Sequence, residues 1–495
     1  MDYVSMLEGI KTVLEPRIIQ FLVAGLLFGF IIGAIPGFND TNVLALVLPF
    51  TVYLGPMQAV MFMMAVFCGS QAGGSVPAIL MNIPGTPSNA PTCIEGFAMT
   101  KKGMAGEALG ASLAASTIGG LISAVVCFVI APIIGVYALS FGPAEMFMVA
   151  VFGLTAVGSL TGKSVSKGLL SSAFGLLLAT VGTEIQVGYT RSSFGLFELY
   201  EGFPLIPVLL GLFGFSELIT MVNEKSIIQE GKTSFKGYSS LFEGMKKAVS
   251  MKLNLIRSSV IGIIIGLIPG TGAAIATWIS YGQSKQWSKT PEKFGTGDYE
   301  GLAASDACNN GVTGGALIPT LTLGIPGSGT TLIIMAALMI NGIQPGPSLF
   351  VEFKTEAYAI FASIVLVNIV MFFAGLVIFR FLPHLSSIPT VILVPIISLF
   401  CLVGGFAYRE LLFDMTLVVI FGLFGALLKK YGYSIPAMLL ALILGPLAEK
   451  NLFWVLQLGG LKLFMRPISF VILIMTLLTL FLPIYLSKMK KTGTS

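Results

Sequence analysis

Apolar residues fill most of this chain in runs that are long enough to cross a membrane. Four of the clearest runs occupy residues 18–35, 113–136, 361–381 and 468–486. Each run can span a hydrocarbon layer roughly 30 Å thick as a helix, and about ten to twelve such segments can be counted. The pattern therefore predicts an all-α polytopic membrane protein.

Glycine and proline interrupt the apolar pattern at places that occur twice, in the same order. The segment GFIIGAIPG at 29–37 returns as GIIIGLIPG at 262–270, and PAILMNIPG at 77–85 returns as PTLTLGIPG at 319–327. A weaker third pair, Ile206-Pro207 and Ile435-Pro436, follows in each half. We therefore predict two structural repeats, residues 1–222 and 258–495, joined by a linker at 223–257. We expect the repeats to be inverted relative to each other.

Each Ile-Pro-Gly motif predicts a broken or re-entrant helix. Proline lacks a backbone N–H, and glycine adopts the conformations with which a helix ends or restarts. The freed backbone groups cannot face lipid, so such a break is buried in protein or lines a wet cavity. Matching breaks in two repeats point to a transporter binding site near the repeat interface. The alternative is that these small residues serve only kinks and close helix packing.

Small and polar residues follow the breaks, and we predict that they bind the substrate. No Lys or Arg is among them, so helix N-termini would meet the charge of an anionic ligand. The predicted substrate-binding residues are Gly37, Asn39, Thr41, Asn82, Gly85, Thr86, Ser88, Gly270, Thr271, Gly272, Gly327, Ser328 and Thr330.

Carboxylates and amides in apolar surroundings are candidates for ion coupling. A carboxylate at membrane depth is costly and usually functional, and oxygen ligands suit a hard cation such as Na⁺. The predicted ion-coupling residues are Asp40, Asn42, Asp306, Asn309 and Asn310. The alternative is that Asp40 and Asp306 cap helices. We expect the remaining glutamates in apolar stretches to lie at the ends of spans: Glu95, Glu107, Glu145, Glu184 and Glu217.

Composition supports a membrane protein and argues against catalysis. Hydrophobic residues make up 55% and charged residues 10% of the 495 residues, whereas about a quarter of a soluble domain is charged. The five cysteines show no metal-ligand spacing, and the single histidine, His384, provides no Ser/His/Asp pattern. We expect no enzyme activity, no cofactor, and no metal beyond a coupling Na⁺.

Lys and Arg gather in the linker and in the C-terminal tail, and both are predicted to be cytoplasmic. The net charge of +5 has this origin and gives no support for a nucleic-acid partner. The lipid bilayer is the expected surroundings of the chain. The oligomeric state stays open, a homo-oligomer included.

The long motifs resemble a known family. The segment 73–88, which reads GGSVPAILMNIPGTPS, resembles the signature of the TctA-type large membrane subunit of tripartite tricarboxylate transporters. The segments GLIPG at 266–270, LTLGIPGS at 321–328 and QPGP at 344–347 resemble it too. The chain departs from the family pattern at Asp40, where an uncharged stretch is usual, at Asp306, where a glutamate is usual, and at Glu95, where an aspartate is usual.

The resemblance implies a permease of the cell inner membrane, a symporter that imports a small tricarboxylate-like or dicarboxylate-like solute. Uptake would be coupled to a Na⁺ or H⁺ gradient, with alternating access to a site between the repeats. It also implies two partners, a small membrane subunit and an extracytoplasmic solute-binding protein. The alternatives are a stand-alone ion-coupled transporter of a different small solute and a channel.

Overall fold

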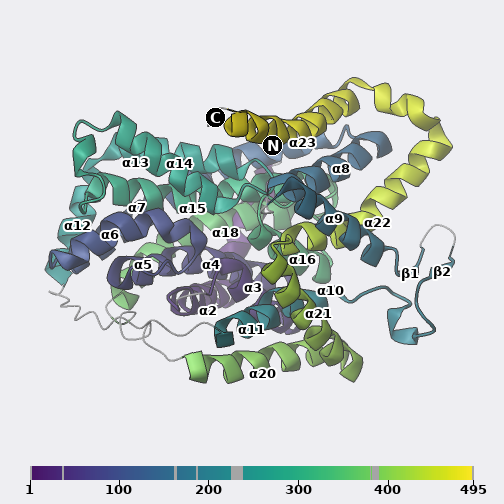
Figure 1. Ribbon diagram of the computed structural model, residues 1–495, viewed down its shortest axis with the longest axis horizontal. Helices are drawn as coiled ribbons and strands as arrows, with labels where there is room; N and C mark the ends of the chain where they lie inside the picture. The colour runs from purple at the N-terminus through teal and green to yellow at the C-terminus, as the bar shows by residue number, and fades with distance from the viewer. Residues whose placement is uncertain are drawn as a thin grey trace. The chain divides into compact units, whose positions relative to one another are not determined.

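Helices form nearly all of the computed structural model (Figure 1), which describes residues 3–35, 38–160, 164–184, 188–223, 238–379, 381 and 390–492. In these ranges the two strands, β1 (Gly182–Thr183) and β2 (Thr190–Arg191), pair antiparallel with Gly182 opposite Arg191. The predicted all-α class is confirmed apart from this short hairpin. Pro36, Gly37 and His384 lie outside the described residues.

The chain divides into two compact units, and each is built from two separate stretches of sequence. Unit 1 contains residues 1–135 and 220–400, and unit 2 contains residues 136–219 and 401–495. Helices α7, α11 and α20 run across the boundaries. Each unit therefore takes one stretch from either side of the linker, so the two predicted halves contribute to both units.

Unit 1 holds most of the helices. They are α1 (Tyr3–Val13), α2 (Pro16–Gly33), α3 (Asp40–Val47), η1 (Leu48–Tyr53), α4 (Pro56–Gly73), α5 (Ser75–Met81), η2 (Pro87–Asn89), α6 (Ala90–Lys101), most of α7 (Ala105–Ala138), α12 (Tyr238–Ser250), α13 (Lys252–Gly266), α14 (Gly272–Trp287), η5 (Pro291–Lys293), α15 (Tyr299–Leu323), α16 (Gly329–Ile340), α17 (Leu349–Glu352), α18 (Lys354–Ile378) and the first part of α20 (Thr390–Arg409).

Unit 2 holds the rest. Its elements are α8 (Pro143–Leu160), α9 (Val165–Ala179), the hairpin β1–β2, η3 (Phe197–Leu199), α10 (Leu205–Leu209), the π-helical turn η4 (Leu210–Phe215), the start of α11 (Ser216–Asn223), α21 (Leu412–Tyr431), α22 (Ile435–Leu458), η6 (Gly460–Met465) and α23 (Pro467–Thr492).

Six of the described helical segments are long and apolar enough to cross a membrane. They are Pro16–Gly33, Pro56–Met81, Ala105–Ala138, Lys354–Ile378, Leu412–Tyr431 and Ile435–Leu458. The pair α12 and α13, bent by 78°, would be a seventh, and several shorter apolar helices accompany them. These helices make the chain a multi-pass membrane protein, while the predicted ten to twelve crossings stay a prediction.

Small residues let α2 pack closely on α4, and α13 packs on α15 in the same way. A Cβ added at Gly29 would lie 2.5 Å from the carbonyl oxygen of Val66, and one at Gly262 would lie 2.4 Å from that of Cys308. Lipid tails are as apolar as a leucine side chain, so close van der Waals packing holds membrane helices together. The GxxxG spacing therefore serves packing, as the alternative interpretation proposed for this part of each motif.

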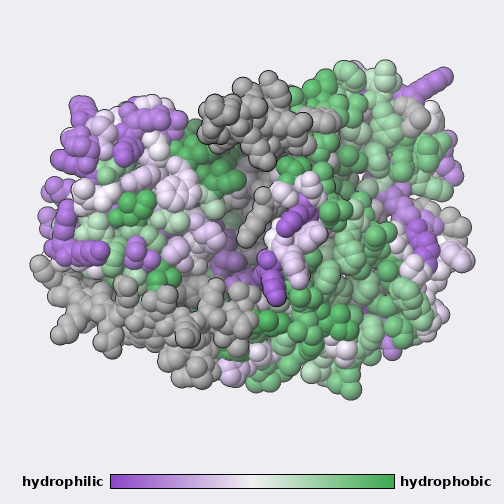
Figure 2. Space-filling view, viewed as in Figure 1, coloured by the Kyte–Doolittle hydropathy of each residue, from purple (hydrophilic) through white to green (hydrophobic). Residues whose placement is uncertain are grey.

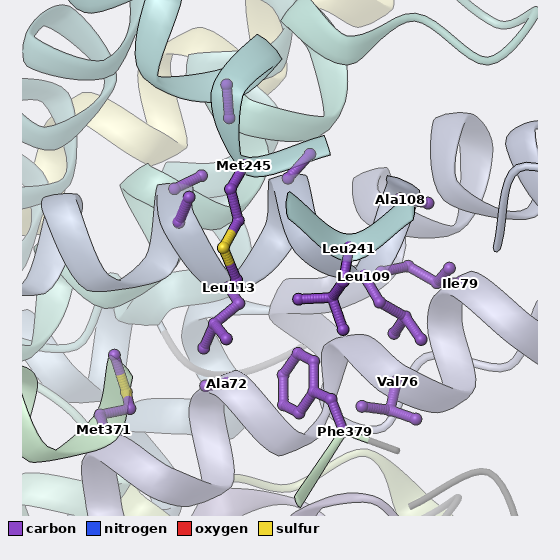
Figure 3. Packing of buried hydrophobic residues seen from close by; sticks show 14 of the residues in the cluster. Ala72, Val76, Ile79, Ala108, Leu109, Leu113, Leu241, Met245, Met371 and Phe379 are labelled. Atoms are coloured by element: carbon purple, nitrogen blue, oxygen red, sulfur yellow. The ribbon is translucent and has the colours of Figure 1, made fainter. Parts of the chain in front are cut away.

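Apolar side chains from distant segments pack against one another in unit 1, as Figure 3 shows. Leu109 of α7 and Leu241 of α12 lie near Val76 of α5 and Phe379, the residue after α18, and all four are fully buried. This cluster holds α5 and α7 in place. Figure 2 shows hydrophilic residues gathered at the end of unit 1 that holds α6, α12 and the start of α13.

Two of the glutamates that the sequence placed at span ends, Glu145 and Glu217, form ion pairs in unit 2 with Arg466 and Lys429. Glu145 near the start of α8 accepts a hydrogen bond from Ser469, and Glu217 near the start of α11 pairs with Lys429. Arg191 donates two hydrogen bonds to Glu449, which raise the pKa of its guanidinium and keep it charged.

Candidate functional site

All four predicted helix breaks are present, and they lie in unit 1. Helix α2 ends at Gly33 and α3 begins at Asp40, α5 ends at Met81 before η2, α13 ends at Gly266 before α14, and α15 ends at Leu323 before α16. A cavity of about 170 Å³ lies where the segments after these breaks meet. It is lined by Asn39, Asp40, Thr41, Phe67, Gln71, Pro87, Ser88, Gly272, Ala273, Ala274, Val312, Ser328, Gly329 and Thr330.

Three helices begin at the wall of this cavity. The first residues of α3, α14 and α16 are Asp40, Gly272 and Gly329, and all three residues line it. The first N–H groups of a helix have no partner within the helix, and this end carries a partial positive charge. Neither Lys nor Arg is among the lining residues. The helix ends and the hydroxyls are therefore the groups able to receive an anion.

Asp40 is the one carboxylate in the described cavity wall. Its Oδ2 atom accepts hydrogen bonds from Thr330 at 2.5 Å and from the side-chain amide of Gln71 at 3.0 Å. The hydroxyl of Thr41 lies 3.1 Å from that of Thr330. Two breaks far apart in sequence thus meet at one carboxylate.

The cap of α3 is Asn39, whose Oδ1 accepts a hydrogen bond from the backbone N–H of Asn42 at 2.9 Å. Asp40 is the first residue inside the helix, so the capping interpretation does not describe it. Asn42 itself is buried, and its side-chain oxygen and nitrogen have no hydrogen-bond partner among the described residues.

Asp306 is the eighth residue of α15 and is fully buried, so the interpretation that it caps a helix is wrong. Its Oδ1 atom accepts hydrogen bonds from Thr92 at 2.7 Å and Ser75 at 3.1 Å, while Oδ2 has no partner within the described chain. Asn309, also buried, has no partner there for either side-chain polar atom. The amide of Asn310 points toward the sulfur of Met371 at 3.6 Å.

A continuous chain of hydrogen bonds joins Asp40 to Asp306. From Asp40 it runs to Gln71, and Gln71 Oε1 lies 3.3 Å from the hydroxyl of Ser88. Ser88 lies 2.7 Å from Thr86, which lies 2.6 Å from Asn89. The Asn89 amide donates to Ser75 at 2.9 Å, and Ser75 donates to Asp306.

Glycine is required where the breaks approach other backbone. A Cβ at Gly85 would lie 2.5 Å from the Cα atom of Gly74, and one at Gly327 would lie 2.7 Å from that of Ala316. Gly270 has a φ of +82°, which favours glycine, and its N–H donates to the carbonyl of Gly327 at 3.0 Å. The Pro-Gly residues therefore bring the breaks together, and the side chains that follow them form the wall.

The structure brings some of the predicted binding residues together and places others elsewhere. Those in the wall are Asn39, Thr41, Ser88, Gly272, Ser328 and Thr330, together with the predicted ion residue Asp40. Asn82 is exposed and ends α5 in the left-handed conformation, with φ of 57°. The Thr271 hydroxyl donates to the carbonyls of Ile265 and Ile268 at the end of α13. Neither lines the cavity, and Gly37 lies outside the described residues.

Sequence reasoning missed the polar residues that lie before or beyond the breaks. Gln71, Ser75, Asn89 and Thr92 are all buried, and the first three belong to the chain between the carboxylates. A signal was available for Gln71, an amide near the end of the apolar helix α4, two residues before Gly73. Nothing in the spacing of the others distinguishes them from ordinary small polar residues in a membrane helix.

Glu95 lies in the middle of the short helix α6 and is fully buried, so its predicted place at a span end is wrong. It accepts hydrogen bonds from the hydroxyl of Tyr281 at 2.7 Å and from the backbone N–H groups of Gly295, Gly297 and Asp298 at 2.6 to 2.8 Å. Four donors satisfy this carboxylate. It fastens the polar loop before α15 to α6.

A cavity that holds polar side chains at the ends of broken apolar helices is typical of a membrane permease. The comparisons agree with this class. The chain belongs to the tripartite tricarboxylate transporter TctA family, whose model matches residues 19–440, and this is a family of transporters and not of enzymes.

Two relatives from Agrobacterium vitis are similar to the chain. One is an uncharacterized 52.8 kDa protein in the TAR-I ttuC' 3' region, 34% identical over 91% of this chain and 90% of the relative. The other is an uncharacterized protein in the TAR-II ttuC' 3' region, 32% identical over 39% of this chain and 79% of the relative. No solved structure gives a significant match.

Proposed function

We propose that this protein is the permease of an ion-coupled secondary transporter that imports a small carboxylate across the inner membrane. The observation that carries this proposal is the cavity, to which the segments following all four helix breaks contribute. Both predicted repeats supply its wall, as expected for a site at a repeat interface. Membership of the TctA family supports a tricarboxylate or a related dicarboxylate as the substrate class.

The substrate carboxylates would bind at the beginnings of α3, α14 and α16. Free backbone N–H groups and the positive helix ends attract an anion there without a Lys or Arg side chain. The hydroxyls of Thr41, Ser88 and Thr330 would fix its orientation.

Asp40 gives a physical reason for ion coupling. A charged carboxylate in a small cavity repels an anionic substrate. Substrate and Asp40 can occupy the cavity together at low cost only when a proton or Na⁺ neutralises Asp40. Occupancy by substrate and by the coupling ion are then linked, which is what a symporter requires.

Unit 1 contains every residue of the cavity wall, and unit 2 contains none of them. We infer an alternating-access mechanism in which unit 1 carries the substrate and unit 2 belongs to the scaffold. A small membrane subunit and an extracytoplasmic solute-binding protein are the proposed partners. The linker and the C-terminus are proposed to face the cytoplasm.

Uptake into proteoliposomes tests this function. The purified chain is assayed with labelled mono-, di- and tricarboxylates while a Na⁺ or an H⁺ gradient is imposed separately. We expect saturable uptake of one carboxylate class, driven by one of the two gradients. Gradient-independent flux that does not saturate would contradict the proposal and favour a channel. Uptake that requires the two partner proteins would establish the tripartite arrangement.

A further inference from the structure

The hydrogen-bonded chain from Asp40 to Asp306 has too few protons for all of its contacts when both carboxylates are charged. The seven groups Asp40, Gln71, Ser88, Thr86, Asn89, Ser75 and Asp306 make six successive contacts, and each contact needs one proton. Each of the three hydroxyls supplies one proton. Each amide also supplies one, because it presents nitrogen at one end and oxygen at the other. Five protons are therefore available for six contacts when both carboxylates are charged.

The deficit is visible in the middle of the chain. The amide nitrogens of Gln71 and Asn89 face outward toward Asp40 and Ser75, so both amide oxygens face the hydroxyls of Ser88 and Thr86. Two hydroxyl protons then serve three contacts. An unsatisfied contact is expensive here because Gln71, Thr86, Ser88 and Asn89 are all at least 96% buried.

One added proton on either carboxylate removes the deficit. If Asp40 carries it, every hydrogen bond points from Asp40 toward Asp306 once the Gln71 amide has turned over. If Asp306 carries it, every hydrogen bond points the other way once the Asn89 amide has turned over. A second added proton would find every contact already served, and it would have to lie on a carboxylate oxygen outside the chain, such as Asp306 Oδ2. A single added proton is therefore sufficient to satisfy every contact.

We propose that Asp40 and Asp306 hold one exchangeable proton between them, shared through this hydrogen-bonded chain. The proposal deepens the proposed function, on which it rests only for its role in transport, by naming H⁺ as an ion that the site can bind. The charge on the cavity carboxylate then depends on the state of a carboxylate buried in α15. Protonation of Asp40 would admit the anionic substrate while Asp306 stays charged.

The ion pairs of the described residues include neither Asp40 nor Asp306. The negative charge of these two carboxylates is therefore not balanced by a paired Lys or Arg among those residues. The elements packed against α3 carry Arg17, Tyr53 and Cys68 as their titratable residues. Those packed against α15 carry Cys68, Cys93, Glu95, Lys101, Glu107, Cys127, Tyr137, Tyr238, Glu243, Lys246, Lys247, Lys252, Arg257, Tyr281, Lys285 and Glu352. The thiol of Cys93 interacts electrostatically with Asp306. No ion pair among the described residues therefore neutralises either carboxylate, and a proton bound to one of them would do so.

The test interrupts the hydrogen-bonded chain by substitution and keeps both carboxylates. Thr86→Val keeps the side-chain shape but removes the hydroxyl, which leaves four contacts and four protons with both carboxylates charged. Thr86→Ser keeps the hydroxyl and is the matched control. Ser75→Ala cuts the chain at a second place with the same count, in case one variant does not fold.

The readout is the infrared absorption of protonated carboxylic acids in the purified full-length chain, followed against pH without substrate and without Na⁺. Asp40→Asn and Asp306→Asn identify the two contributions. In wild type and Thr86→Ser we expect two widely separated protonation steps, as for a coupled pair. In Thr86→Val and Ser75→Ala the first proton should bind at a pH lower by about one unit or more.

Equal titration curves in the wild type and in both cut variants would overturn the proposal, because the carboxylates would then titrate without regard to the chain. Appearance of both acid bands in a single step in wild type would overturn it as well. Neither outcome bears on whether the protein transports a carboxylate, because substrate is absent. Failure of the proteoliposome assay would likewise leave the titration result standing.

Discussion

The two long Ile-Pro-Gly regions, 77–86 and 319–328, use one backbone device for different chemistry. In both, a helix ends in a left-handed residue, Asn82 or Gly324, and the next N–H bonds back to the carbonyl of Pro77 or Pro319. In both, a glycine then approaches other backbone closely. The backbone turn is therefore the shared part of the two regions.

The side chains that follow the two turns differ. After the first, Thr86, Ser88 and Asn89 form the buried chain that leads to Asp306. After the second, Ser328 caps α16 together with Thr331, and the helix begins at the cavity wall. One turn thus provides a polar connection between two carboxylates, and the other provides a helix N-terminus at the cavity wall. The comparison teaches that this duplicated backbone leaves its polar residues free to diverge.

The two carboxylates, Asp40 and Asp306, also have no counterpart in the other half. By the spacing of the motif pairs, Asp40 corresponds to Ala273, which also lines the cavity, and Asp306 corresponds to the buried Met64. Each half supplies one acid where the other half has an apolar residue.

The largest effect is expected from filling the close approach that the two turns share. In Gly85→Leu or Gly327→Leu, the new side chain would meet backbone that cannot move aside, at a cost of about 1–3 kcal/mol or more. We expect uptake to be abolished by either substitution while the protein remains in the membrane. Gly282→Leu, where an added Cβ meets nothing within 4 Å, is the control and should transport normally. Normal uptake by both variants at 85 and 327 would disprove a role for these turns in the site.

Asp40→Asn should separate substrate binding from ion coupling. The amide is neutral, as the protonated acid would be, so the variant should still exchange substrate across the membrane. Gradient-driven accumulation should fall by at least about tenfold, within the usual range of coupling free energies. Exchange and accumulation are measured on the same proteoliposomes, and Asn39→Asp provides a variant with an added acid at the neighbouring position. Accumulation equal to wild type would show that Asp40 takes no part in coupling.

Ala273→Asp should make the two halves alike by adding a second acid to the cavity. Two carboxylates in one small cavity repel an anionic substrate more strongly than one does. We expect affinity for the substrate to fall by about tenfold at neutral pH, a change of roughly 1.4 kcal/mol. The loss should shrink as the pH is lowered and the acids become protonated. Ala273→Asn controls for the size of the side chain, and an equal loss in that variant would assign the effect to packing.

The smallest effect is expected from exchanging the left-handed residues of the two turns. Asn and Gly both tolerate this conformation, so Asn82→Gly and Gly324→Asn should change stability by less than about 1 kcal/mol. A β-branched residue does not tolerate it, and Gly324→Val should cost about 1–2 kcal/mol more. Thermal unfolding in detergent measures the series. A large loss in Asn82→Gly would mean that the Asn82 side chain does more than end the helix.

Sequence reasoning predicted the class of fold and the position of the breaks because both depend on local chemistry. Apolar runs of membrane length predict helices, and Pro followed by Gly predicts their ends whatever the surroundings. It identified Asp40 and Asp306 because a carboxylate is conspicuous in an apolar stretch. It misjudged Glu95, because three of its four donors belong to a loop that begins 200 residues further along the chain. The predicted repeat boundaries and their inversion stay predictions.

The sequence by itself determined that this chain is a helical membrane protein with paired helix breaks and few charges, since composition and periodicity carry that information. Only the tertiary structure decided which polar residues meet. Thr41 and Thr330 are 289 residues apart, and Ser75 and Asp306 are 231 residues apart, yet each pair is within hydrogen-bonding distance. Contacts between such distant residues depend on helix packing. Local spacing does not encode which faces the packing brings together.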